Sequence, residues 1–125
     1  MSLTKKPSYI KEPTSLQCGQ SVLAMLTEKT VEQINIECGT ERETTLAQMK
    51  AVLKSNGISF ENERKCASKK EDLPKIALLS LETPRCWHWS LYFDGTFYDP
   101  EHGVMNDFPL CKRKYYWEIK EEAIC

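Results

Sequence analysis

Apolar residues recur at helical spacing through the first half of the chain. Directly after Cys18 and Gly19 they leave almost no polar face, which predicts a buried helix over residues 18–27. The segment before it, residues 1–16, contains two prolines and predicts an extended lead-in. The first regular element is therefore expected to begin at a cysteine and to form part of the core.

Two further helices are predicted before residue 57. Thr30 and Gln33 stand at the positions of a capping box, so residues 30–35 predict a short second helix. Residues 44–54 place apolar side chains on one face, and Asn-Gly follows as a stop signal.

The pattern changes in the second half of the chain. Residues 76–81 form a nearly continuous apolar run, short enough for a central strand buried on both faces. Residues 58–60 predict a short strand and residues 114–119 a last one. Because helices come first and an antiparallel sheet second, we predict an α+β fold in which N-terminal helices pack on a C-terminal sheet.

A β-hairpin is the strongest local signal in this half. Two runs rich in aromatic residues flank the Asp-Gly pair at 94–95, which suits a tight two-residue turn. With that turn, Ser90 lies opposite Asp99, and His88 shares the sheet face of Ser90 because side chains alternate. Asp99 is then a diagonal neighbour of His88, within reach of a side-chain hydrogen bond.

Composition restricts the class of protein. The 125 residues are enough for one domain, 1–125, with a sizeable core, and 41% hydrophobic and 28% charged residues are ordinary for a globular protein. A net charge of −1 gives no support to nucleic-acid binding. No apolar run approaches a membrane span, and no signal-peptide core follows the start. We therefore expect a monomer that works in the cytoplasm or leaves the cell by a route that needs no signal.

Six cysteines are a high count for such a chain. An even number suggests disulfides in a secreted protein, but no export signal supports that here. None forms a C-x-x-C pair, so a structural zinc site and a dithiol redox site are disfavoured. The positions are Cys18, Cys38, Cys66, Cys86, Cys111 and Cys125.

Cys18, His88 and Asp99 form a candidate nucleophile, base and orienting group. A cysteine at a helix start lies near unpaired N–H groups and the positive end of the dipole, which favour its thiolate. Each residue also has an ordinary alternative: a cysteine on an apolar helix is usually core, His102 competes with His88, and Asp-Pro often initiates a turn. The helix-start position of Cys18 and the predicted hairpin favour the catalytic interpretation.

With these residues in place, the sequence resembles the papain-like cysteine peptidases, and most of all the small bacteriocin-processing domains of some bacterial peptide exporters and their stand-alone relatives. Those domains open with Cys-Gly at the start of a buried helix, as at 18–19 here. They place His before an aromatic residue at a strand start, as at 88–89, and end the site with Asp-Pro and a nearby Gly, as at 99–100 and Gly103. The resemblance covers nearly the whole chain in order, length and element type.

The sequence departs from that family at one position. The family has Gln six residues before the Cys, where its amide helps bind the oxyanion, and here that residue is Glu12. An ionised carboxylate repels an oxyanion, so Glu12 has to be protonated or turned away, or Gln17 or Gln20 has to replace it. Loss of one oxyanion donor costs about 10² to 10³ in rate.

The resemblance implies acyl transfer without a metal or cofactor. Cys18 attacks a carbonyl as a thiolate, His88 transfers the proton, and Asp99 orients the imidazole. The N–H of Cys18, with Glu12 or Gln17, binds the oxyanion. The same groups serve peptide hydrolysis, deamidation or transfer to an amine, so we expect a cysteine hydrolase that acts on an amide bond in a peptide or protein substrate.

Two alternatives belong to other classes of protein. Glu12 favours a weakly active or inactive papain-like domain that binds a peptide segment in the same cleft. A thiol redox protein is the third interpretation, and the absence of a C-x-x-C pair argues against it.

Overall fold

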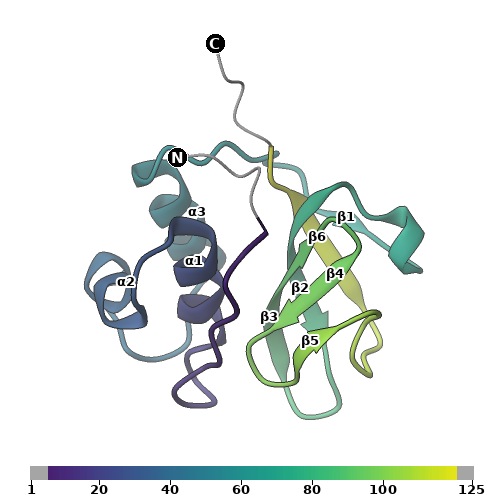
Figure 1. Cartoon of the computed structure of the whole chain (residues 1–125), viewed down its shortest axis with the longest axis horizontal. Coiled ribbons are helices and arrows are strands. Elements are labelled where there is room, and N and C mark those ends of the chain that lie inside the picture. The colour runs from purple at the N-terminus through teal and green to yellow at the C-terminus, as the bar shows by residue number, and fades with distance from the viewer. Residues whose placement is uncertain (1–5, 121–125) are drawn as a thin grey trace.

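The computed structural model describes residues 6–120 and arranges them in two layers, with helices on one side and a sheet on the other (Figure 1). The helices are α1 (Cys18–Thr27), α2 (Val31–Cys38) and α3 (Leu46–Ser55). A short 3₁₀ turn, η1 (Lys70–Asp72), precedes the central strand. The strands are β1 (Lys65–Cys66), β2 (Ile76–Glu82), β3 (Trp87–Phe93), β4 (Thr96–Asp99), β5 (Gly103–Met105) and β6 (Lys114–Glu118). The predicted α+β class is confirmed.

Side-chain caps set the starts of α2 and α3. Thr30 accepts the Gln33 N–H (3.1 Å), and the Gln33 side chain accepts the Thr30 N–H (2.9 Å), which is the predicted capping box. The third helix begins later than predicted because Thr45 is its cap, with Gln48 as the reciprocal partner. Thr44 stays outside the helix, where its carbonyl accepts the indole N–H of Trp89 (3.2 Å).

Strand β2 lies at the centre of the six-stranded sheet. The strand order is β1-β6-β2-β3-β4-β5, and each neighbouring pair is antiparallel. Side chains of β2 alternate between two apolar clusters, which confirms the prediction of a strand buried on both faces. The predicted strand at 58–60 is reduced to one bridge between Phe60 and Ile119.

The larger of the two clusters lies between the sheet and the helices. All ten residues of α1 are buried, as predicted for a helix without a polar face. The smaller cluster, on the far face of the sheet, is formed by Ala77, Leu79, Leu81, Tyr92 and Phe97. Helix α1 is therefore held in the middle of the molecule, and its first residue is fixed relative to the sheet.

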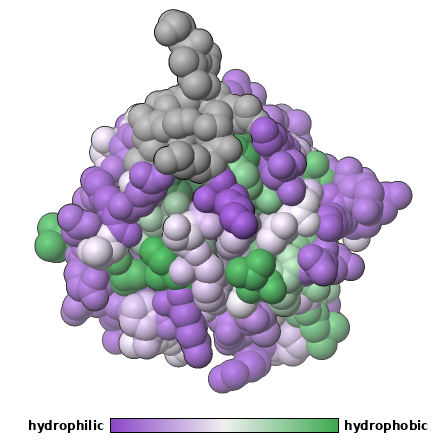
Figure 2. Space-filling model, viewed as in Figure 1, coloured by the Kyte–Doolittle hydropathy of each residue, from purple (hydrophilic) through white to green (hydrophobic). Residues whose placement is uncertain are grey.

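One face of the molecule is mostly polar (Figure 2). On the face shown in Figure 2, hydrophilic residues predominate and hydrophobic ones lie in small separate groups. Within residues 6–120 no helix is long and apolar enough to cross a membrane.

The hairpin has the predicted register. Phe93 pairs with Thr96 across the turn, and Asp94 (φ 45°) and Gly95 (φ 91°) both adopt the left-handed backbone conformation that a type I′ turn requires. The ladder between β3 and β4 covers residues 91–93 of β3 and does not extend to the beginning of that strand. The first residues of β3 are thus free of a β4 neighbour, and the candidate site lies there.

Candidate active site

Cys18 is the first residue of α1 and lies at the junction of the two layers. The residue before it, Gln17, makes no side-chain cap to the helix. The Cys18 N–H donates to no acceptor among residues 6–120, so an unpaired helix N–H lies beside the thiol. A Cβ on Gly19 would overlap the Thr44 hydroxyl, which explains why the cysteine is followed by glycine.

Of the cysteines in the described part of the chain, Cys18 and Cys86 line the cleft that also contains His88. Five cysteines are free: Cys18, Cys38, Cys66, Cys86 and Cys111. Cys125 lies outside the described residues. Cys86 lines the cleft next to Cys18 but is exposed, whereas Cys18 is 9% exposed.

His88 and Asp99 are joined by the predicted hydrogen bond. His88 Nε2 lies 2.8 Å from Asp99 Oδ1, and both side chains are buried. Residue 88 is near the start of β3 and residue 99 is the end of β4, so the hairpin brings them together although eleven positions separate them.

Both carboxylate oxygens of Asp99 accept hydrogen bonds. Its Oδ2 accepts the Ser90 hydroxyl (2.9 Å). Its Oδ1 also accepts the N–H groups of Glu101 and His102 (3.0 Å each) and lies 3.0 Å from His102 Nδ1. Burial acts to raise the pKa of Asp99, but the hydrogen bond and charge of His88 and the bonds from His102 lower it to about 2. Asp99 is therefore a carboxylate at neutral pH.

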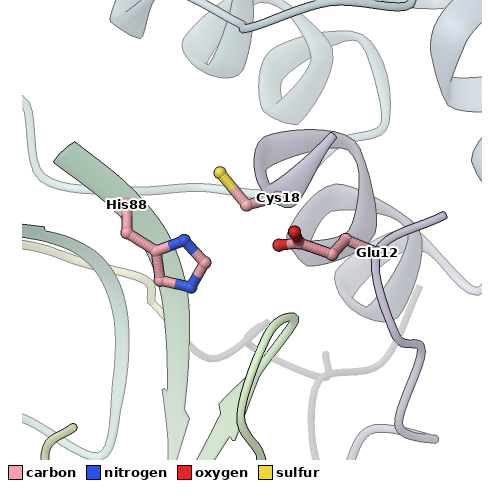
Figure 3. A group of neighbouring side chains, drawn as sticks. All are labelled: Glu12, Cys18 and His88. Carbon is pink, nitrogen blue, oxygen red and sulfur yellow. The ribbon is translucent and has the colours of Figure 1, made fainter. Parts of the chain in front are cut away.

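Cys18 and His88 meet where β3 lacks a β4 neighbour. The Trp89 N–H donates to Cys18 Sγ (3.5 Å), in place of a backbone acceptor from β4. Because Nε2 of His88 is used by Asp99, Nδ1 is the ring nitrogen that faces the sulfur, as Figure 3 shows. Burial acts to lower the pKa of His88, but hydrogen bonds with Asp99 and Cys18 and their negative charges raise it to about 10. His88 is therefore held as an imidazolium at neutral pH.

Glu12 also points into the site. Its segment is held against the β4 end by two bonds, from the Tyr9 hydroxyl to Asp99 O (2.6 Å) and from the Glu12 N–H to Pro100 O (3.0 Å). The Glu12 carboxyl is directed toward Cys18 and His88 (Figure 3). Its Oε1 is buried and has no hydrogen-bond partner among residues 6–120.

The surroundings of Glu12 raise its pKa above the ordinary value. Burial raises the pKa of Glu12, the charges of Glu101 and Asp99 raise it further, and His88 acts in the opposite direction. Of the possibilities left by the sequence, a Glu12 turned away from the site is not observed, and a protonated Glu12 agrees with the direction of the pKa shift.

The other sequence candidates take different positions. The amide of Gln17 donates to Glu41 O (3.0 Å), and the amide of Gln20 donates to Thr40 O (3.3 Å) and Arg42 O (2.7 Å). Both side chains thus anchor the loop after α2 and do not replace Glu12. His102 is half-exposed, and it contacts Asp99, which the sequence did not predict.

A cleft of about 540 Å³ opens in front of the thiol. Cys18 and His88 lie in its lining, and Leu16, Trp87 and Trp89 provide apolar walls. Trp87 stacks on Tyr115 (5.8 Å between ring centroids) and is 49% exposed, so one aromatic wall is open to a bound chain.

Two groups of side chains around His88 have the donor types of a metal site. One joins Glu12, Cys18 and His88, and the other joins His88, Asp99 and His102. In each group one potential ligand atom per residue lies within 4.8 Å of the others.

Comparison with known proteins does not assign the chain to a family. No protein-family model matches it, and no curated protein matches it significantly. Any assignment of function therefore depends on the residues of this site and on their geometry.

Proposed function

We propose that this protein is a papain-like cysteine hydrolase that cleaves or deamidates an amide bond in a peptide or protein. The observation that carries the proposal is the buried imidazole of His88, bonded to Asp99 through Nε2 and facing Cys18 with Nδ1. The ring thus lies between a carboxylate and a thiol at the end of a cleft, which is the arrangement that a nucleophile, a base and an orienting group require.

The proposed chemistry is acyl transfer through a thioester. Cys18 Sγ attacks the substrate carbonyl, and an S–C bond forms. His88 gives its proton to the leaving nitrogen as the C–N bond breaks, which releases an amine or ammonia. Water then attacks the thioester carbon as His88 takes its proton, and the S–C bond breaks. The carboxylic acid leaves, and Cys18 and the protonated His88 are regenerated. Asp99 holds the imidazole in one orientation and stabilises its charged form.

Two groups are available for the oxyanion. The unpaired N–H of Cys18 is the first. The second is the Glu12 carboxyl, which donates a hydrogen bond when it carries its proton and repels the oxyanion when it does not. The raised pKa of Glu12 extends the range in which it is a donor.

The experiment is the alkylation rate of Cys18 against pH, in the wild type and in His88→Ala, with each cysteine followed separately by peptide mass. Two other thiols serve as references within the same chain: Cys66 is exposed, and burial and the Glu37 charge raise the pKa of Cys38 to about 11. At pH 6.5 an ordinary thiol of pKa about 8.5 is about 1% ionised, so we expect Cys18 to react about 100-fold faster than Cys66.

In His88→Ala the advantage of Cys18 over Cys66 is expected to disappear. If wild-type Cys18 reacts no faster than Cys66 at pH 6.5, the hydrolase proposal is wrong. The second candidate, a domain that binds a peptide segment without cleaving it, then stands, because binding in the cleft does not require an activated thiol.

A further inference from the structure

We infer that Glu12, Cys18 and His88 together bind a zinc ion, and that the bound ion reversibly blocks the thiol. The binding site follows from the positions of the three side chains alone. The blocking of Cys18 chemistry rests, in addition, on the function proposed above.

The three donors are of the types that zinc selects. They are a thiolate sulfur, an imidazole nitrogen and a carboxylate oxygen, and they lie within 4.8 Å of one another (Figure 3). With zinc bonds of about 2.0 to 2.3 Å, the donors of a tetrahedral site are roughly 3 to 4 Å apart. The donors therefore have to approach by no more than roughly 1 to 2 Å. Rotation of the Glu12 side chain shortens the separations that involve its carboxylate, since its Oε1 has no partner to lose within residues 6–120.

Asp99 already supports His88 in the way that a metal-bound histidine requires. Metal-bound histidines usually donate their other ring N–H to a carboxylate, which fixes the tautomer and the ring orientation. Asp99 lies 2.8 Å from Nε2 and leaves Nδ1 free to face the other two ligands. Three protein ligands leave the fourth position open toward the cleft.

The neighbouring group, His88, Asp99 and His102, does not offer the same site. Oδ1 of Asp99 already accepts bonds from His88 and from the N–H groups of Glu101 and His102, and Oδ2 accepts the Ser90 hydroxyl. A metal there would displace bonds that are made, whereas a metal at Glu12 satisfies an oxygen that has none.

The identity of residue 12 is the decisive feature. A glutamine amide at this position can donate to an oxyanion but is a poor ligand for zinc, and a glutamate carboxylate is a good one. The mixed sulfur, nitrogen and oxygen set also favours zinc or cobalt over magnesium or calcium, which prefer oxygen ligands alone.

The binding test is a Co²⁺ titration of the full chain, with a phosphine as the reductant so that no added thiol competes. We expect an absorption band from sulfur-to-cobalt charge transfer, displaced by Zn²⁺, in the wild type and in the matched control Cys66→Ser. The band is expected to be absent in Cys18→Ser. Glu12→Gln is expected to weaken Co²⁺ binding by at least about 10-fold, the loss typical of even an outer-shell partner.

A titration without variants of the ligands gives an independent check. Prior alkylation of Cys18 by iodoacetamide is expected to abolish the band, and His102→Ala is expected to leave it in place. Absence of a sulfur band, or equal Co²⁺ affinity of the wild type and Glu12→Gln, overturns the inference whatever the activity of the protein.

The blocking test is the alkylation rate of Cys18 with and without Zn²⁺. We expect Zn²⁺ to slow alkylation of Cys18 but not of Cys66, a chelator to restore it, and the effect to require higher Zn²⁺ in Glu12→Gln. If Co²⁺ binds as expected but Cys18 is an ordinary thiol, the metal site is present and the hydrolase proposal alone fails. If Zn²⁺ binds and does not slow Cys18, the blocking role is wrong.

Discussion

The two sides of the His88 ring differ in how completely their polar atoms are bonded. On the Asp99 side, both carboxylate oxygens accept hydrogen bonds, from a hydroxyl, an imidazole and two backbone N–H groups. On the Glu12 side, a buried carboxyl oxygen and the Cys18 N–H have no partner among residues 6–120. Both carboxyls face the same imidazole. Both oxygens of Asp99 accept hydrogen bonds, whereas Oε1 of Glu12 has no partner among residues 6–120.

This contrast separates two tasks. A carboxylate whose two oxygens both accept hydrogen bonds is held in one position, so Asp99 can fix the orientation of His88. A buried oxygen without a partner costs about 1–3 kcal/mol, and a ligand that satisfies the group offsets that cost. The Asp99 side thus sets the geometry of the site, and the Glu12 side is where an oxyanion or a cation is expected to bind.

The variant expected to have the largest effect is Asp99→Asn, which changes the carboxylate that orients His88. The amide keeps the size of the carboxyl but has no negative charge to stabilise an imidazolium, and its NH₂ group can hold the wrong tautomer, so we expect the acylation rate to fall by about 10³- to 10⁴-fold. The measurement is acylation of Cys18 by p-nitrophenyl acetate, with the release of nitrophenol followed in time.

The same variant has a signature in stability that a damaged active site alone does not produce. The folded-state pKa of Asp99, about 2, lies below its ordinary value of 3.8. Its stabilising contribution is therefore complete above about pH 4 and is lost as the pH falls through that interval. Urea unfolding between pH 5 and pH 2.5 should show a smaller loss of stability in Asp99→Asn than in the wild type. If the stability of both proteins depends on pH in the same way, Asp99 is not a hydrogen-bonded carboxylate with a lowered pKa.

Glu12→Gln replaces the carboxyl at position 12 with an amide, which is a hydrogen-bond donor at every pH. The amide donates at every pH, whereas the carboxyl donates only when protonated, so the two proteins should acylate at similar rates at low pH. As the pH rises and Glu12 ionises, the variant should become faster than the wild type, by up to about 10²-fold. The measurement is the ratio of acylation rates against pH, with Glu12→Ala as the control that removes the donor entirely. A ratio that does not change with pH would mean that Glu12 does not contact the oxyanion.

Ser90→Ala removes one hydrogen bond to Asp99 and keeps the others. The Ser90 hydroxyl is buried and donates to Oδ2 of Asp99, while the bond to His88 is made by Oδ1. Hydrogen bonds to charged groups contribute about 1.5–3 kcal/mol, so we expect that loss in the free energy of unfolding. The acylation rate should stay within about tenfold, or about 1.4 kcal/mol, of the wild type.

A matched control for that variant is Ser55→Ala, which removes a hydroxyl that bonds to the Val52 carbonyl at the end of α3. Its effect on unfolding should be within about 0.5 kcal/mol. Equal losses for the two serines would indicate that the bond to Asp99 carries no special weight.

Much of the fold could be predicted because local signals agreed with one another. The capping residues of α2, the Asp-Gly turn and the apolar run of β2 each specify structure within a few residues, and each prediction is confirmed. The His88–Asp99 contact was within reach of the same logic, because a two-residue hairpin fixes which side chains are diagonal neighbours.

What the sequence did not predict depends on contacts between distant segments. Tyr9 is bonded to Asp99 O across 90 positions, and this bond helps to place Glu12 in the site. The donation from Trp89 N–H to Cys18 Sγ follows from where the β3–β4 ladder stops, which no local pattern encodes. Gln17 and Gln20, open as oxyanion donors from spacing alone, bond instead to the loop after α2.

His102→Ala gives the smallest expected effect and tests whether His88 or His102 is the base that acts on Cys18. His102 and His88 both lie about 3 Å from Asp99 Oδ1, at 3.0 and 2.8 Å, but His102 is half-exposed and is not in the group with Cys18 and Glu12. Asp99 keeps its other bonds when His102 is removed, and water can replace an exposed partner, so stability should change by less than about 1 kcal/mol. The pH profile of Cys18 alkylation should match the wild type, whereas that of His88→Ala should not. If His102→Ala loses the advantage of Cys18 over Cys66 instead, the base is His102, and contact with Asp99 rather than burial beside the thiol is what assigns the catalytic histidine.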